Sequence, residues 1–219
     1  MTAGMNRRAA LGGAMAAGAV AVTARAQAKP LVIEWNMHMF SRNMAKFPFH
    51  PKATYRPDPA KNPADPLAEY LKRMSAEGID RALFVQPEPY GDDHRLVLDC
   101  LSRTSPDKFK GTSLFYPRDS EAPRKLVALV KSEPRICSTR FHANRGNKNY
   151  MDSFADTGVR ALWKQAVDLD LVVELHIGPS VARDAGKVIA AHPGCKVVID
   201  HLAEQATGTP DEFADVLDL

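Results

Sequence analysis

The chain has 219 residues, of which 45% are hydrophobic and 25% are charged, a composition typical of a globular protein with one sizeable core. The formal net charge of +3 comes from Arg7, Arg8 and Arg25, because the rest of the chain has 26 basic and 26 acidic residues. A balanced charge gives no indication of a nucleic acid or an anionic membrane as partner.

Residues 1–28 have the features of a bacterial export signal. Two adjacent arginines precede the weakly apolar run AALGGAMAAGAVAV, and ARAQA then offers small residues at A-x-A spacing, which predicts cleavage after Ala26 or Ala28. Paired arginines before a mild apolar segment favour the twin-arginine route over an ordinary Sec signal. The run is too short to form a stable membrane span. We therefore expect a periplasmic or secreted protein whose mature domain is residues 29–219.

Strand-like and helix-like segments alternate along the mature domain. After the first strand comes a segment of about residues 39–63, rich in proline, lysine and aromatic residues, and a loop of this length is usually functional. Asp65 caps a helix that Gly78 ends, and Thr209 with Glu212 predicts a capping box for the last helix. The other helices are predicted to begin at Asp92 or Asp93, Ser120, Thr157 and Ser180. The predicted strands are PLVIEW, RALFVQP, KGTSLFYP, RICSTRFH, LVVELHIG and CKVVIDHL.

Repeated βα units predict a parallel sheet with right-handed crossovers. Near-continuous apolar strands such as LVVEL and KVVI are typical of strands buried on both faces. The candidate architectures are an open doubly wound sheet and a β/α barrel. Because no glycine-rich phosphate loop follows the first strand, a nucleotide-binding fold is disfavoured.

Histidines recur at the carboxyl ends of the predicted strands, where a β/α barrel places its active site. A single histidine there would more often be a hydrogen-bonded core residue, but several in one register favour a functional cluster. These histidines are His38, His142, His176 and His201. Other polar residues at the same ends are Gln86, Tyr90, Arg140 and Asp200. His50, His94 and His192 lie outside the register, and we expect His94 and His192 to be structural.

The segments VIEWNMHMFS, VQPEPYGDDHRLVLDCL, HIGPS and VVIDHL together resemble the amidohydrolase-related family of the amidohydrolase superfamily. The QP-x-x-YG-x-D segment is similar to the 2-pyrone-4,6-dicarboxylate lactonase-like group in particular. The resemblance covers nearly the whole mature domain and implies a distorted β/α barrel of the TIM type. It implies a hydrolase acting on a small carboxylated substrate such as a lactone, or alternatively a decarboxylase of the same branch.

The family pattern has His-x-His after strand one, a histidine after each of strands five and six, and an aspartate after strand eight. His38 matches the second histidine of the pair, and Asn36 replaces the first. His176 matches the histidine of strand five, and His201 that of strand six. The resemblance thus implies that His38, His176 and His201 are catalytic.

The same resemblance implies the substrate contacts. Arg140 is similar to the strand-four arginine that meets a substrate carboxylate, and a structural salt bridge is its alternative. Gln86 and Tyr90 belong to the lactonase-like segment, and Asn36 lies beside the histidines, so all three are candidate substrate-binding residues. Asn36 could instead bond loop backbone. Asp200 is expected to orient His201 or to bond a helix terminus.

A zinc-type divalent metal is the cofactor that the resemblance implies, with His38 and His176 as ligands. The amide oxygen of Asn36 is a poorer zinc ligand than imidazole, so the two histidines would hold zinc weakly. The substitution therefore favours either a lost activity or a metal-independent mechanism, in which arginine and histidine polarise an ester carbonyl.

A complete barrel typically has about 250 residues, and this chain stops soon after the helix that follows strand six. We expect six of eight βα units, without strands seven and eight and the strand-eight aspartate. A second chain could cover the resulting open edge, so an oligomer is compatible with the sequence. A non-catalytic remnant or binding protein is the rival hypothesis to an enzyme. The three cysteines, Cys100, Cys137 and Cys195, lack CxxC spacing and are expected to be free thiols.

Overall fold

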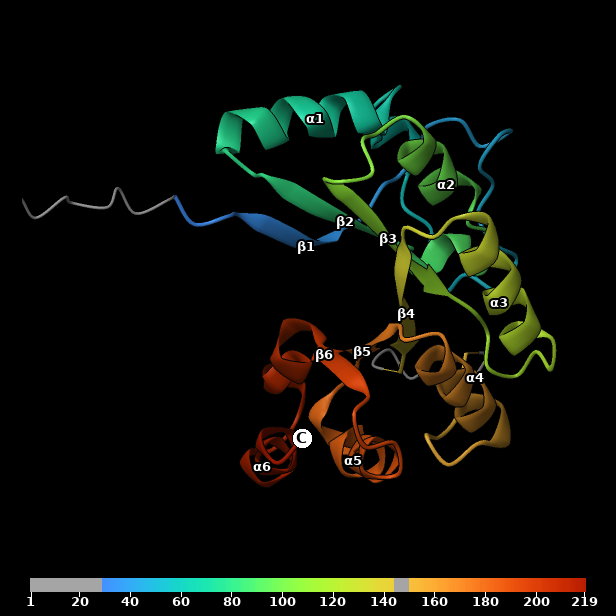
Figure 1. The fold of residues 1–219 in the computed structure, drawn as a ribbon, viewed down its shortest axis with the longest axis vertical. Coiled ribbons are helices and arrows are strands. Elements are labelled where there is room, and N and C mark those ends of the chain that lie inside the picture. Colours follow the sequence, from blue (N-terminus) through green and yellow to red (C-terminus); the bar gives the residue numbers. More distant parts are fainter. Residues whose placement is uncertain (1–28, 144–149) are drawn as a thin grey trace, which may run out of the picture. The chain divides into compact units, whose positions relative to one another are not determined.

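A six-stranded parallel sheet organises the unit between Leu31 and Leu219 (Figure 1). The computed structural model describes residues 29–143 and 150–219, so the proposed export signal lies outside the described residues. The strands are β1 (Ile33–Met37), β2 (Arg81–Val85), β3 (Phe109–Leu114), β4 (Ile136–His142), β5 (Val172–His176) and β6 (Lys196–Ile199).

A helix follows each strand and lies on the outer side of the curled sheet (Figure 1). Each strand pairs with the next in sequence, without the reversal of order that marks a doubly wound sheet. The sheet is therefore part of a TIM-type barrel, as predicted. The helices are α1 (Pro66–Glu77), α2 (Arg95–Ser102), α3 (Ala122–Ser132), α4 (Thr157–Asp168), α5 (Ala182–Ala190) and α6 (Pro210–Leu217). The 3₁₀ turns are η1 (Pro59–Lys61), η2 (Glu88–Tyr90), η3 (Pro179–Val181) and η4 (Asp200–Thr207).

The predicted helix ends are partly confirmed. Asp65 accepts hydrogen bonds from two N–H groups at the start of α1, and Gly78 ends that helix with a φ of 67°. The capping box of Thr209 and Glu212 is present. Three predicted helix starts are wrong, because neither Asp92 nor Asp93 caps α2, Glu121 rather than Ser120 precedes α3, and Ser180 lies in η3, before α5.

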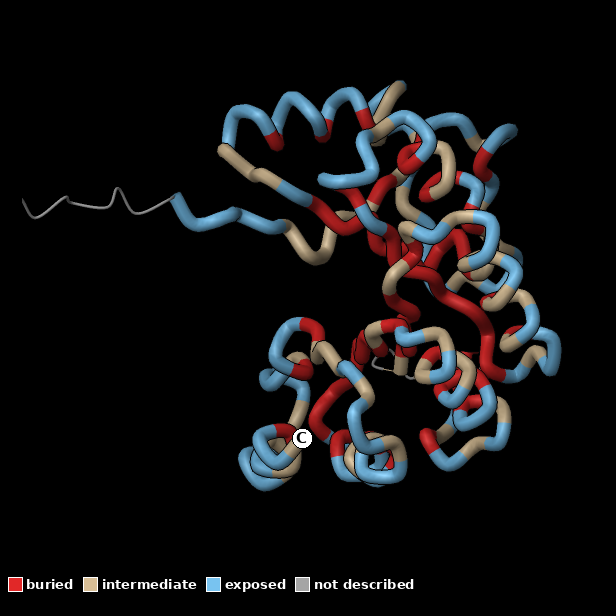
Figure 2. Tube along the Cα trace, in the orientation of Figure 1, coloured by how far each residue is buried: buried red, intermediate tan, exposed pale blue. Residues whose placement is uncertain are grey.

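The two faces of the sheet differ in polarity, with apolar side chains toward the helices and polar side chains on the inner face. Phe141 on β4 points to the helix layer, where its ring lies 5.3 Å from that of the buried Trp163 of α4. The alternate residues Ser138, Arg140 and His142 point to the opposite, inner face and are also buried. Figure 2 shows buried residues along β2 to β5, while much of the outer surface of the helices is exposed.

Two strands form the edges of the sheet within the described part of the chain, β1 and β6. Leu31, Val32 and Ile33 at the β1 edge are 58%, 42% and 54% exposed. No helix in the described ranges has the length and apolar character needed to cross a membrane. The three cysteines are free thiols, as predicted.

Candidate functional site

Arg140 lies at the centre of a polar cluster on the inner face of the sheet. Its Nε and Nη2 donate to Oδ2 of Asp200 at 2.9 and 2.5 Å, and Oε1 of Glu174 lies 3.0 Å from Nε. The β4–β5 register places Arg140 beside Glu174, and Asp200 directly follows β6. Three successive strands thus fix one guanidinium. Asp200 was predicted to serve His201 or a helix terminus; its carboxylate instead pairs with Arg140.

His38 directly follows β1, as predicted, and faces the same guanidinium. Its Nδ1 lies 3.0 Å from the carbonyl oxygen of Val85, and its Nε2 lies 3.3 Å from Nη1 of Arg140. Because a carbonyl only accepts, Nδ1 carries the hydrogen and Nε2 accepts from Arg140. Burial, reinforced by the charge of Arg140, lowers the pKa of His38 to about 4. The imidazole is therefore neutral at neutral pH.

His176 and His201 lie beside each other, with ring centroids 5.3 Å apart. Nε2 of His176 lies 2.6 Å from Oε1 of Glu204, and Nδ2 of Asn36 lies 3.3 Å from Nε2 of His201. Burial lowers the pKa of His176, with the charge of Arg140 as a second cause. Asn36 therefore reaches across from β1 to the segment after β6. His38 and His176 lie near Arg140, and His201 and Asn36 join this group through the contacts of His201 with His176 and Asn36.

The segment that carries His201 is a left-handed turn rather than the end of a strand. β6 ends at Ile199, and His201, Leu202, Ala203 and Glu204 have φ values of 50°, 51°, 53° and 46°. Residues with a Cβ atom adopt this conformation at a cost of roughly 1–2 kcal/mol each. Such strain persists only where surrounding contacts hold the backbone, and it concentrates at functional sites.

Glu174 is a member of the cluster that the sequence analysis missed. Its side chain is fully buried on β5 and accepts a hydrogen bond from the Thr112 hydroxyl at 3.2 Å. Burial raises the pKa of Glu174 to about 8. A signal was present, because a glutamate inside the apolar strand LVVELH is costly to bury without a partner.

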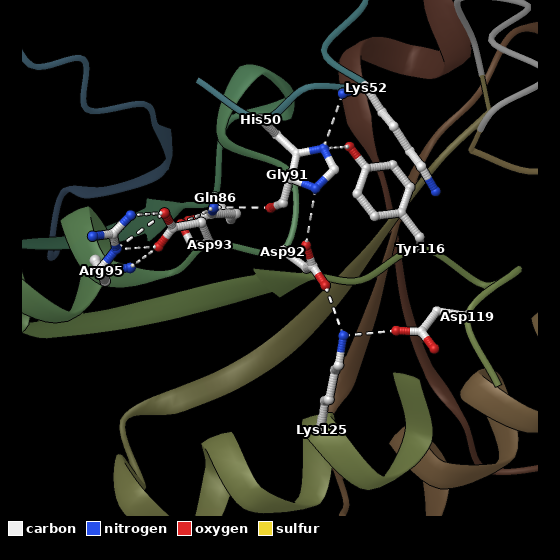
Figure 3. Close-up of polar contacts among 10 residues, drawn as sticks. All are labelled: His50, Lys52, Gln86, Gly91, Asp92, Asp93, Arg95, Tyr116, Asp119 and Lys125. Carbon is white, nitrogen blue, oxygen red and sulfur yellow. Dashed lines mark hydrogen bonds and ion pairs between the residues drawn. The ribbon is translucent and has the colours of Figure 1, made fainter. Parts of the chain in front are cut away.

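Gln86 and Tyr90 hold the loops of the site. Nε2 of Gln86 donates to the carbonyl oxygens of Gly91 and Asp93 at 2.9 and 2.8 Å (Figure 3). The Tyr90 hydroxyl accepts from the backbone N–H of Ser41 at 2.9 Å. The polar contacts of both side chains thus fasten the segments that follow β1 and β2.

A second polar network fastens the long loop that follows His38 (Figure 3). His50 from this loop places Nδ1 3.1 Å from the Tyr116 hydroxyl and Nε2 3.6 Å from Oδ1 of Asp92. Lys125 of α3 lies 3.2 Å from Asp92 and 2.7 Å from Asp119. The loop is therefore anchored to the segments after β2 and β3, at the carboxyl ends of the strands.

The geometry around His38 and His176 does not suit a zinc-type ion. The guanidinium of Arg140 lies against Nε2 of His38, and a cation placed there would be repelled by that charge. Nε2 of His176 is engaged by Glu204. Within residues 29–143 and 150–219, no three His, Cys, Asp or Glu side chains gather as metal ligands would.

Comparison with known proteins agrees with the fold. The amidohydrolase family profile matches residues 35–218. A 4-sulfomuconolactone hydrolase of Rhizobium radiobacter is 24% identical over 183 residues, covering 78% of this chain and 53% of that protein. The chain thus spans about half the length of this curated relative.

Solved structures show the same fold. A protein of Acinetobacter baumannii, described as a probable 2-pyrone-4,6-dicarboxylic acid hydrolase with citric acid bound, has a TM-score of 0.69 at 20% identity. The match covers 85% of this chain and 65% of that one. A 5-carboxyvanillate decarboxylase of Novosphingobium aromaticivorans, complexed with manganese, has a TM-score of 0.51 at 14% identity, with coverages of 80% and 66%.

Proposed function

The chain belongs to the amidohydrolase family, and from this premise we propose that it hydrolyses a small carboxylated lactone at the inner face of its half-barrel. The observation that carries the proposal is that His38 and His176 lie near one buried arginine, with His201 beside His176. A carboxylated ester needs a cation for its carboxylate, a donor for its carbonyl and an acceptor for the proton of water. The cluster offers all three.

The role of each side chain follows from its hydrogen bonds. Nε2 of His176 donates to Glu204, which leaves the lone pair on Nδ1, an atom without a hydrogen-bond partner among the described residues. We assign this atom the role of the base that accepts the proton of the attacking water. His201 is exposed, and because its Nε2 accepts from Asn36, its Nδ1 carries a hydrogen that can bond the carbonyl oxygen.

Arg140 binds the substrate carboxylate through Nη1, and His38 orients the guanidinium of Arg140. Water then attacks the carbonyl carbon as His176 takes its proton. The ring C–O bond breaks, and the ring oxygen leaves with the bonding electron pair and takes up that proton from His176. Gln86 and Tyr90 support the site through the loops they hold. The guanidinium beside His38 and the replacement of a histidine by Asn36 favour a metal-independent form of this chemistry.

Decarboxylation is the second candidate, because a carboxyvanillate decarboxylase shares the fold. Both reactions start from a carboxylated substrate. Decarboxylation releases CO2, whereas lactone hydrolysis opens the ring. An inactive remnant is the rival to both, since Asn36 replaces a family histidine. We also propose that residues 1–28 direct export, either to the periplasm or out of the cell.

The test is hydrolysis of 2-pyrone-4,6-dicarboxylate by the purified chain, followed by loss of lactone absorbance with CO2 measured in parallel. We expect ring opening in the wild type and its loss by a factor of about 10² or more in His176→Ala. His192→Ala is the control, because His192 bonds the Val188 carbonyl at the end of α5, and it should stay near wild type. Equal effects of the two substitutions would contradict the assignment.

A further inference from the structure

We propose that Asp200 and Glu174 are positioning residues that hold Arg140 with a single nitrogen, Nη1, turned to the substrate. The proposal rests on the proposed function and specifies how the site recognises a carboxylate. A free guanidinium binds a carboxylate through two nitrogens in fork geometry. Here Nε and Nη2 already donate to Asp200, with Glu174 beside Nε. Nη1 donates one of its two hydrogens to His38, and its second hydrogen is the one that the acidic side chains leave open.

Burial makes this arrangement rigid. Arg140 is 2% exposed, Asp200 4% and Glu174 0%, so solvent does not compete for their contacts. The Thr112 hydroxyl donates to the second oxygen of Glu174, which fixes that carboxylate in turn. An arginine side chain has about 2 kcal/mol of rotamer entropy when free. Anchoring one end from β5 and the segment after β6 therefore defines where Nη1 lies relative to His38.

As a consequence, Arg140 recognises the substrate carboxylate through one hydrogen bond at a fixed position and not through a bidentate pair. Nη1 is the one nitrogen that donates to the substrate. A carboxylate therefore binds only where the rest of the substrate places one of its oxygens near Nη1, beside His38. The inferred substrate class is a rigid cyclic ester with a ring-attached carboxylate, because a rigid ring fixes the distance between carboxylate and carbonyl.

Asp200→Asn and Glu174→Gln test the proposal, because each keeps the shape of the side chain and replaces its carboxyl group by an amide. We measure equilibrium binding of pyridine-2,4-dicarboxylate, a planar dicarboxylate that cannot be hydrolysed, together with KM and kcat for the lactone. We expect the Kd and the KM to rise about tenfold in each variant, with kcat changed less than threefold. Asp215→Asn is the matched control, since Asp215 pairs with Arg183 at the surface, and it should leave all three constants unchanged.

Chemical rescue separates this proposal from the proposed function. In Arg140→Ala, guanidinium chloride at about 10 mM should raise Tm by a few degrees over equal sodium chloride, because the ion refills the space beside the Asp200 carboxylate and the Glu174 carboxyl group. The rise should vanish in Arg140→Ala with Asp200→Asn. Rescue without lactone hydrolysis in the wild type would overturn the function and keep the positioning. Absent rescue, or unchanged dicarboxylate binding in both Asp200→Asn and Glu174→Gln, would overturn the positioning.

Discussion

On the inner face, alternate positions of β4 and β5 are occupied by polar side chains. Arg140 of β4 lies beside Glu174 of β5, and His142 lies beside His176. This placement follows from strand periodicity, because successive side chains point to opposite faces. The positions of His142 and His176 could therefore be predicted from the sequence. Their partners could not, since Asp200 reaches Arg140 only through the path that the chain takes after β6.

A substitution at Tyr90 distinguishes two roles for this residue, binding the substrate and anchoring a loop. Its buried hydroxyl accepts from the Ser41 backbone N–H, so Tyr90→Phe leaves that donor unpaired. We expect the free energy of unfolding to fall by about 1–3 kcal/mol, with KM for the lactone unchanged. Urea denaturation and steady-state kinetics measure the two quantities. A raised KM at unchanged stability would instead make Tyr90 a substrate-binding residue, as the lactonase-like segment implies.

At the scale of the elements, the turn after β6 is where the sequence was least informative. The run CKVVIDHL predicts a strand through His201, yet the strand stops at Ile199 and four residues adopt positive φ. None of them is glycine or asparagine, the residues that signal such a conformation. Contacts distant in sequence hold the turn, from Asn36 to His201 and from His176 to Glu204. Local propensity cannot report contacts of this kind.

Leu202 allows the strain in this turn to be measured. The residue has a φ of 51° and is 68% exposed, so replacing it removes little packing. Leu202→Gly should stabilise the protein by about 1 kcal/mol, because glycine carries no Cβ penalty there. Leu71→Gly is the control in regular helix α1, where glycine should destabilise by about 1 kcal/mol. Destabilisation by both substitutions in urea melts would contradict a left-handed turn.

For the whole molecule, alternation of apolar strands with capped helices was enough to predict a parallel sheet, and the family resemblance added the barrel. The sequential strand order decides against the doubly wound alternative, which the pattern of strands and helices had left open. Asp65 and Gly78 predicted the ends of α1 because their chemistry is local. The start of α2 was missed because His94, a buried residue without a side-chain cap bond, precedes it.

His94 links the stability of the whole fold to pH. Its buried ring accepts the Leu114 backbone N–H at Nε2, at 3.0 Å, and burial lowers its pKa from 6.5 to about 4. Between these values the unfolded chain binds more protons than the folded one, so the free energy of unfolding falls as pH falls from 6.5 to about 4. The loss from His94 should be about 3 kcal/mol between pH 7 and pH 4.

His94→Gln isolates this contribution, because the amide oxygen can accept the Leu114 N–H without titrating. Urea denaturation at pH 7 and pH 4 should show that the variant loses about 3 kcal/mol less than the wild type over this interval. His192→Gln is the control, since His192 lies at the end of α5 and is only partly buried. It should keep the wild-type dependence. Should His94→Gln lose as much as the wild type, the unfolded chain would not be gaining its extra proton at His94, and the acid sensitivity of the fold would have to come from other groups such as His38.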